Sequence, residues 1–124
     1  MQNRILVIDD DRDVLDLTEF ILKDKGFEVI ASLTADILED IILVDPDLIL
    51  LDDWLEGTSG HELCKKLKST RATQHIKIVI FSASTGLKEI AEHCLADDYI
   101  EKPFDIEFMT DMIQTLLKSD TKSV

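Results

Sequence analysis

Acidic side chains follow two short apolar runs of the 124-residue chain. Asp9, Asp10 and Asp11 come directly after ILVI, and Asp52 and Asp53 come directly after LILL. Carboxylates of this kind can bind a hard divalent cation, and one of them can attack an electrophilic phosphorus. These five residues are therefore the first candidates for a chemical site.

Two further segments end in residues that could complete such a site. Ser82 and Ser84 follow the run KIVIF, and Lys102 follows the segment DYIE. In an open sheet of parallel strands, the carboxyl ends of the strands meet at one edge, and ligands bind there. If these segments are parallel strands, the carboxylates, Ser82 and Lys102 share one crevice.

Clustered carboxylates at this edge would need a counter-charge. Two unit charges about 4 Å apart repel by roughly 4 kcal/mol at an effective dielectric constant of 20. Mg²⁺ is the natural counter-ion, with Mn²⁺ as an alternative, because it takes oxygen ligands and commonly binds carboxylates together with a phosphate. Lys102 would supply the remaining positive charge. A carboxylate beside the cation, an ammonium group and a hydroxyl can attack phosphorus and become an acyl phosphate.

The elements that must position these residues alternate along the chain. Five short apolar segments are typical of buried parallel strands: residues 5–8, 27–31, 48–51, 76–81 and 98–100. The apolar residues of five other segments follow the helical period: residues 14–22, 37–42, 63–67, 87–94 and 106–117. We expect helix caps at Asp11, Ser59 (with Glu62) and Asp105, and the second helix must end before Pro46.

This alternation predicts an α/β fold, a doubly wound parallel sheet with helices on both faces. We expect one domain over residues 1–118 and a polar, frayed tail over residues 119–124.

Composition narrows the classes of partner. The formal net charge of −13 disfavours direct binding to nucleic acids and to anionic membranes. The N-terminal segment is neither a signal peptide nor a spanning helix, so a cytoplasmic protein is expected. Cys64 and Cys94 are predicted to be free, partly buried thiols, and the three histidines are expected at the surface.

The motifs, in their order, resemble the receiver domain of two-component response regulators. ILVIDDD at residues 5–11 matches the acidic pair after the first strand, PDLILLD at residues 46–52 closes the third, and DDYIEKPF at residues 97–104 contains the lysine-proline pair. The resemblance covers nearly the whole chain. It implies a flavodoxin-like (βα)5 fold with strand order 2-1-3-4-5 and helices on both faces.

The resemblance also implies roles for individual residues. Asp9 and Asp10 match the acidic pair that holds Mg²⁺, and Asp52 matches the phosphoacceptor, which is also a metal ligand. The backbone carbonyl of Trp54 would be a further metal ligand.

Ser82, Lys102 and Tyr99 match the remaining functional positions of the family. Ser82 would bond the phosphoryl group, and Lys102 would pair with it. Tyr99 would form a switch with Ser82, and the Lys102–Pro103 peptide bond is commonly cis in such domains. Trp54 and Ser84 occupy positions that tune the lifetime of the phosphoryl group.

The leading hypothesis is therefore a Mg²⁺-dependent phosphoacceptor rather than a conventional enzyme. It would take a phosphoryl group from a sensor histidine kinase or a phosphotransfer protein onto Asp52, later hydrolyse it, and switch an output partner through the helix 4 to helix 5 face. A phosphorylation-dependent dimer is a further expectation. The alternative is a receiver-like interaction module that works without phosphorylation. Whether the chain stands alone or belongs to a longer protein stays open.

The adjacent aspartates 52 and 53 should point to opposite sides, because side chains alternate along a strand. Asp52 is expected to face the metal crevice, and Asp53 to be a helix-side or solvent carboxylate. On the last helix, Phe108 and Met112 lie off the main apolar stripe. They either form part of an exposed docking face or pack in the ordinary way against the rest of the protein.

Overall fold

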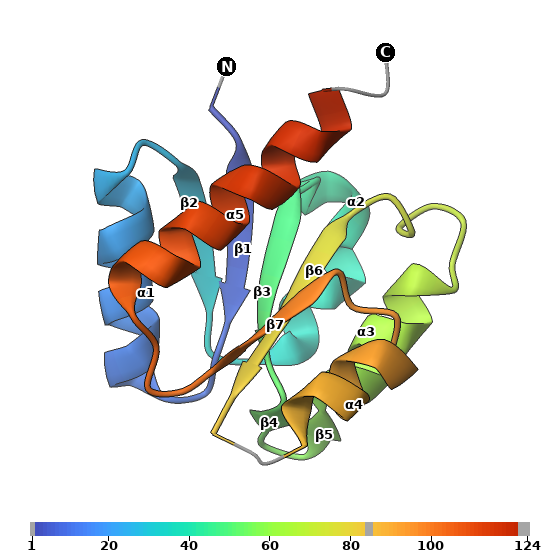
Figure 1. The fold of residues 1–124 in the computed structure, drawn as a ribbon. Helices are drawn as coiled ribbons and strands as arrows, with labels where there is room; N and C mark the ends of the chain where they lie inside the picture. Colours follow the sequence, from blue (N-terminus) through green and yellow to red (C-terminus); the bar gives the residue numbers. More distant parts are fainter. Residues whose placement is uncertain (1, 84–85, 122–124) are drawn as a thin grey trace.

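A five-stranded parallel sheet forms the centre of the molecule in the computed structural model (Figure 1). The structure describes residues 2–83 and 86–121, the last three without their side chains, so Ser84 and residues 122–124 lie outside it. The strands are β1 (Arg4–Ile8), β2 (Glu28–Ser32), β3 (Leu48–Asp52), β6 (Lys77–Ser82) and β7 (Asp98–Glu101). Their order is β2-β1-β3-β6-β7. Because β4 and β5 form a separate hairpin, β6 and β7 are the fourth and fifth strands of this sheet, and the order is the predicted 2-1-3-4-5.

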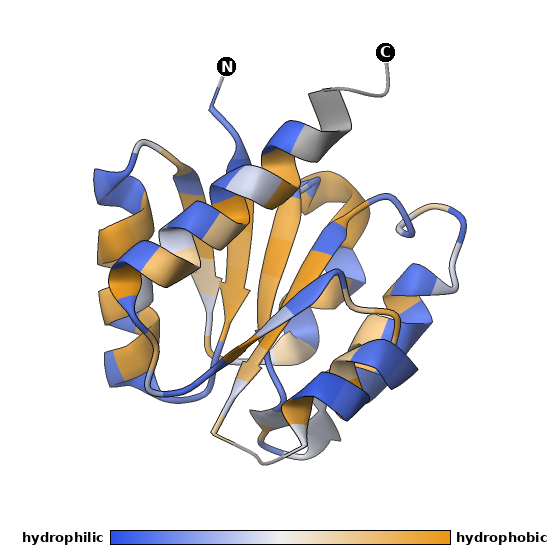
Figure 2. Ribbon diagram, viewed as in Figure 1, coloured by the Kyte–Doolittle hydropathy of each residue, from blue (hydrophilic) through white to orange (hydrophobic). Residues whose placement is uncertain are grey.

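Each central strand buries side chains on both faces, which is why its sequence is almost wholly apolar. On β3, Leu48 and Leu50 pack into one core, and Ile49 and Leu51 pack into the other; all four are fully buried. Figure 2 shows the hydrophobic strands inside and hydrophilic positions on the outer helices.

Helices cover the two faces of the sheet. They are α1 (Arg12–Asp24), the 3₁₀ helix η1 (Ala35–Asp40), α2 (Ile41–Val44), α3 (Gly60–Lys68), α4 (Leu87–His93) and α5 (Ile106–Thr121). Side chains of α1 and α5 line one core, and side chains of α2, α3 and α4 line the other. The doubly wound α/β fold is therefore confirmed.

Predicted helix caps are present at the starts of three helices. Asp11 accepts hydrogen bonds from the backbone N–H groups of Asp13 and Val14 at the start of α1. Ser59 accepts from Glu62 N at 3.4 Å, and Asp105 accepts from Phe108 N at 3.0 Å. These caps fix where α1, α3 and α5 leave the carboxyl edge of the sheet.

The second helix differs from its prediction. Residues 35–44 form six residues of 3₁₀ helix followed by four of α-helix, and the segment ends at Asp45 in a left-handed conformation before Pro46. Ile42, assigned to the buried stripe, is 65% exposed, because the change of helical pitch rotates it outward. On α1, the helical period over residues 14–22 predicts a buried Leu17. In the structure Leu17 is 53% exposed, and Leu15 faces the core instead.

Two features extend beyond the predicted elements. A short antiparallel hairpin, β4 (Trp54–Leu55) and β5 (Thr58–Ser59), follows β3, and Gly57 in its turn has a φ of 78°. Helix α5 continues to Thr121, into the segment that was expected to be a frayed tail. Among the described residues, no helix combines the length and apolar character needed to cross a membrane.

Candidate functional site

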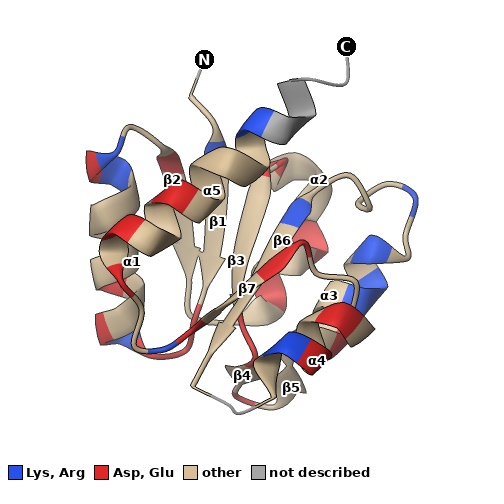
Figure 3. Cartoon of the chain, in the orientation of Figure 1, with Lys and Arg blue, Asp and Glu red and all other residues tan. Residues whose placement is uncertain are grey.

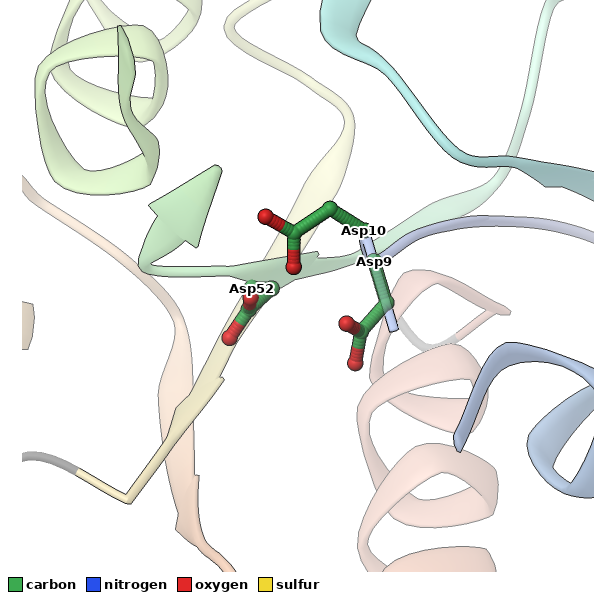
Figure 4. A group of neighbouring side chains, drawn as sticks. All are labelled: Asp9, Asp10 and Asp52. Carbon is green, nitrogen blue, oxygen red and sulfur yellow. The ribbon is translucent and has the colours of Figure 1, made fainter. Parts of the chain in front are cut away.

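Three carboxylates meet at the carboxyl edge of the sheet. Asp9 and Asp10 follow β1, and Asp52 is the last residue of the neighbouring strand β3. One carboxylate oxygen from each residue can be chosen so that all three lie within 4.8 Å of one another. Figure 4 shows the three side chains gathered around this point, Asp9 and Asp10 from just after the end of β1 and Asp52 from the end of β3. The predicted metal-binding carboxylates are thus brought together.

Lys102 joins this cluster from the segment after β7. Its Nζ lies 2.9 Å from Asp9 Oδ2 and 3.4 Å from Asp52 Oδ1, so one ammonium group bridges two carboxylates. The same Nζ lies 4.6 Å from the centre of the Phe81 ring, a cation–π contact. Asp9 and Asp52 are buried, whereas Asp10 is exposed.

The cluster changes the acidity of its members. Burial raises the pKa of Asp52 to about 6; the Lys102 charge opposes this shift and the Asp9 charge adds to it. For Lys102, burial alone would lower the pKa, but the hydrogen bond to Asp9 and the charge of Asp52 outweigh burial and raise it. Lys102 therefore stays cationic, and Asp52 is a carboxylate whose charge is costly to bury.

Backbone hydrogen bonds hold Asp9 in position. Its N–H donates to Ser32 O at 3.1 Å, which extends the pairing with β2 beyond the end of β1. Its Oδ1 accepts from Asp11 N at 2.9 Å, and Oδ2 remains directed to Lys102. Asp11 itself caps α1, so the acidic triplet divides into site residues and a helix cap.

Asp53 is turned away from the cluster toward α3. Its Oδ1 accepts from His61 N at 3.0 Å and lies 2.8 Å from His61 Nδ1. Of the two predicted locations, the helix side is correct and the solvent is wrong, because Asp53 is only 3% exposed.

Gly60 lets α3 approach this strand end closely. Its N–H donates to Asp53 O at 2.8 Å, and a Cβ built on Gly60 would lie 2.1 Å from Asp52 O. Only glycine fits such an approach without displacement of the backbone. Neither this contact nor the Asp53–His61 pair is predicted from the sequence pattern; the glycine directly after the Ser59 cap is the available signal.

Ser82 and Trp54 lie at the cluster, whereas Tyr99 lies elsewhere. An open depression at the strand ends is lined by Asp9, Asp10, Asp11, Asp52, Trp54, Ser82, Ala83 and Lys102. Ser82 is buried at the end of β6, and the Trp54 side chain is 70% exposed. Tyr99 is half-buried on β7 and lines a separate groove against α5.

The residues of the depression fit a hard divalent cation. All donors of the acidic group are carboxylate oxygens, which Mg²⁺ and Mn²⁺ prefer. Asp9 and Asp52 are two buried carboxylates, and the single ammonium group of Lys102 contacts both, so it balances their negative charge only in part. An ion at this place would complete the compensation.

The remaining candidates fall outside the depression. Cys64 and Cys94 are free and buried, and the Cys64 thiol donates to Cys94 O at 3.4 Å between α3 and the end of α4. His75 and His93 are exposed, as expected, whereas His61 is half-buried against Asp53. The Lys102–Pro103 peptide bond is cis.

Comparison with known proteins identifies relatives of the chain. The family described as "Response regulator receiver domain" matches residues 5–114. The CheY-like receiver domain protein from Methanospirillum hungatei JF-1 is 30% identical, with a TM-score of 0.90 and a match that covers 100% of both chains. NtrX from Brucella abortus is 32% identical, with a TM-score of 0.85, over 99% of this chain and 29% of that one. The receiver domain of DrrB, described as activated by BeF3, is 26% identical, with a TM-score of 0.80, over 95% of this chain and 99% of that one.

Proposed function

Because the chain belongs to the response regulator receiver domain family, we propose that Asp52 is its phosphoacceptor. The donor is a sensor histidine kinase or a histidine phosphotransfer protein. The observation that carries this assignment is the position of the Asp52 carboxylate, buried between Lys102 and the acidic pair Asp9 and Asp10. This carboxylate has a costly negative charge and a cation beside it, as a nucleophile for phosphoryl transfer needs.

In the transfer step, a carboxylate oxygen of Asp52 attacks the phosphorus of the donor phosphohistidine. A P–O bond forms while the P–N bond breaks, and the electron pair of that bond stays on the donor imidazole. The Lys102 ammonium stabilises the charge on the transferred oxygens, and the Ser82 hydroxyl donates a hydrogen bond to the phosphoryl group. Water later attacks the same phosphorus: a P–O bond to the water oxygen forms, the P–O bond to Asp52 breaks with its electron pair left on the carboxylate, and inorganic phosphate and a proton leave.

A divalent cation fits the same proposal. Asp9, Asp10, Asp52 and the backbone carbonyl of Trp54 would hold Mg²⁺, with Mn²⁺ as an alternative. When bound, the ion would supply positive charge to the phosphoryl oxygens and reduce repulsion among the carboxylates.

The donor protein needs a surface beside Asp52. An apolar cavity adjoins the depression, lined by Val14, Leu17, Ala83, Lys102, Pro103, Phe104 and Ile106. Leu17 and Ile106 are 53% and 45% exposed, so an apolar partner surface could cover them. Docking there would bring a donor histidine to the carboxyl edge of the sheet.

The output is a change of partner binding at the face formed by α4 and α5. Ser82 ends β6, and Tyr99 lies on the paired strand β7. A phosphoryl group that draws Ser82 toward Asp52 would leave space into which Tyr99 can turn, and this movement would alter the surface next to α5. Residues 1–118 as the working unit and a cytoplasmic location belong to the same proposal.

Intact-mass measurement tests the proposal. With a small phosphodonor and Mg²⁺, we expect one added phosphate in the wild-type protein and in Asp53→Asn, and none in Asp52→Asn. The single Trp54 allows Mg²⁺ and BeF3 binding to be followed by fluorescence. An adduct that persists in Asp52→Asn contradicts the assignment. Failure of the wild-type protein to bind either ligand would favour the phosphorylation-independent module.

A further inference from the structure

A groove runs between the outer strand β7 and one face of α5. Its apolar lining includes Tyr99 and Phe104 from the strand side and Phe108, Met112 and Leu116 from the helix. The helix residues are spaced by four, so they form one stripe along α5. Phe108 is 56% exposed, which settles the expectation for this residue in favour of an accessible face.

The rim of this groove carries charge of one sign. Asp98 and Glu101 line it from β7, Asp105 lines it from the residue before α5, and Asp111 lines it from the middle of that helix. No lysine, arginine or histidine is among the described residues that line it. Figure 3 shows acidic positions on both β7 and α5. An apolar floor with an acidic rim is complementary to an apolar segment flanked by basic residues.

Strand β7 adds backbone groups to this surface. It pairs with β6 on one side and is the last strand of the sheet on the other. An outer strand presents N–H and C=O groups that an incoming extended segment can use. A peptide in the groove would therefore find backbone partners, apolar contacts and acidic side chains together.

A second copy of the chain fits this groove poorly. A two-fold interface places the same patch on both subunits, so the four rim carboxylates would face four identical ones. Like charges brought close together repel one another, and no lysine, arginine or histidine among the described lining residues would offset this repulsion. The net charge of −13 adds repulsion between whole molecules.

We infer that the β7–α5 groove is a docking site for a basic segment with apolar anchors, supplied by the output protein. The inference rests on the proposed function only in its assignment of the partner as the output protein. It also places any phosphorylation-dependent dimer of this chain on a different surface.

Two synthetic peptides with the same leucine and phenylalanine residues test the charge requirement. One has flanking lysines and arginines, and the other has glutamates and aspartates at those positions. In a titration of isotope-labelled, unphosphorylated protein, we expect only the basic peptide to bind, with NMR shifts confined to β7 and α5. Its affinity should fall as salt is added.

Variants separate this groove from the general acidity of the protein. Phe108→Ala should weaken binding of the basic peptide by about tenfold, and Asp111→Asn by about threefold. The matched control Asp16→Asn removes one exposed charge from α1, outside the groove, and should leave the affinity unchanged.

Three results would overturn the inference: equal binding of both peptides, equal weakening by Asp16→Asn and Asp111→Asn, or self-association through the groove in sedimentation. Because the assay uses neither phosphodonor nor Mg²⁺, its failure leaves the role of Asp52 untouched. Failure of the phosphorylation test likewise leaves the peptide result intact.

Discussion

Asp52 and Asp53 are neighbours with almost equal burial, 5% and 3% exposed, in opposite electrostatic surroundings. Asp52 faces other carboxylates and shares the single ammonium of Lys102 with Asp9. Asp53 accepts from the backbone at the start of α3 and is paired with the His61 ring. Burial alone therefore does not identify a functional carboxylate; what matters is whether the fold supplies donors for it.

The difference has opposite consequences for stability. A buried carboxylate with backbone donors stabilises the element that supplies those donors. A buried carboxylate among like charges lowers stability until a ligand compensates it. The same strand end thus contains a structural contact and a site held ready for charge compensation.

The closest contact at this strand end should give the largest effect. Gly60→Ala places a Cβ 2.1 Å from Asp52 O and 2.8 Å from Asp53 Cα, so strand or helix must move. We expect a loss of about 4 kcal/mol in the free energy of unfolding, measured by urea denaturation. The control Gly57→Ala has open space at a φ of +78° and should lose only about 1 kcal/mol. Equal losses would contradict the role of close approach.

Substitution of Asp53, the carboxylate that has hydrogen-bond donors, should have the next largest effect on the free energy of unfolding. Asp53→Ala removes a buried carboxylate and leaves the half-buried His61 N–H without its acceptor, so we expect a loss of about 2 kcal/mol. Asp53→Asn retains an acceptor oxygen and should lose less. Urea denaturation at neutral pH measures both variants, and a stabilised Asp53→Ala would contradict the comparison.

Substitution of Asp52, the carboxylate among like charges, should raise the free energy of unfolding instead of lowering it. The pKa of Asp52 is raised from 3.8 to about 6 in the folded protein. A raised folded pKa gives stability that is complete below about pH 4 and lost as pH rises through about 6. Asp52→Asn should therefore gain about 2 kcal/mol over the wild type at pH 7 without metal, and little at pH 4.

Denaturation with a chelator across this pH range measures the gain. Addition of saturating Mg²⁺ should reduce or reverse it, because the ion stabilises the wild-type carboxylate cluster more strongly. A variant less stable than the wild type at pH 7 without metal would show that Lys102 already compensates Asp52.

The smallest effect is expected at the ring that accompanies Asp53. The His61 side chain is 44% exposed, so solvent weakens its interaction with Asp53, and the backbone hydrogen bond survives substitution. His61→Ala should lose less than about 1 kcal/mol by urea denaturation. A loss as large as that of Asp53→Ala would show that the imidazole ring, and not the backbone N–H of α3, is the main stabilising partner of Asp53.

Much of the fold follows from local patterns in the sequence. Runs such as ILVI and LILL fill both cores because each strand is covered on two faces, and Asp11, Ser59 and Asp105 mark helix starts through their own side chains. The second helix was predicted less well. Its apolar spacing suits an α-helix, but ten residues are divided between two helical pitches before Pro46.

The site could be predicted as a set of residues but not as a set of contacts. The five residues stand at strand ends or directly after them, so parallel pairing brings them to one edge: Asp9, Asp10, Asp52, Ser82 and Lys102. The bridging position of Lys102 could not be predicted, because the path of the chain after β7 sets it. The contact of Gly60 with Asp52 could not be predicted either, because it depends on the distance between a helix and a strand.

Lys102 and Asp9 are separated by 93 residues, and Lys102 and Asp52 by 50. No fragment that lacks the first or the last strand can form this cluster, and long-range contacts of this kind form only when most of the chain has assembled. Charge compensation at Asp52 is therefore a property of the completed sheet. A phosphoryl-accepting assay would accordingly also report native folding, since partly folded chains would be silent in it.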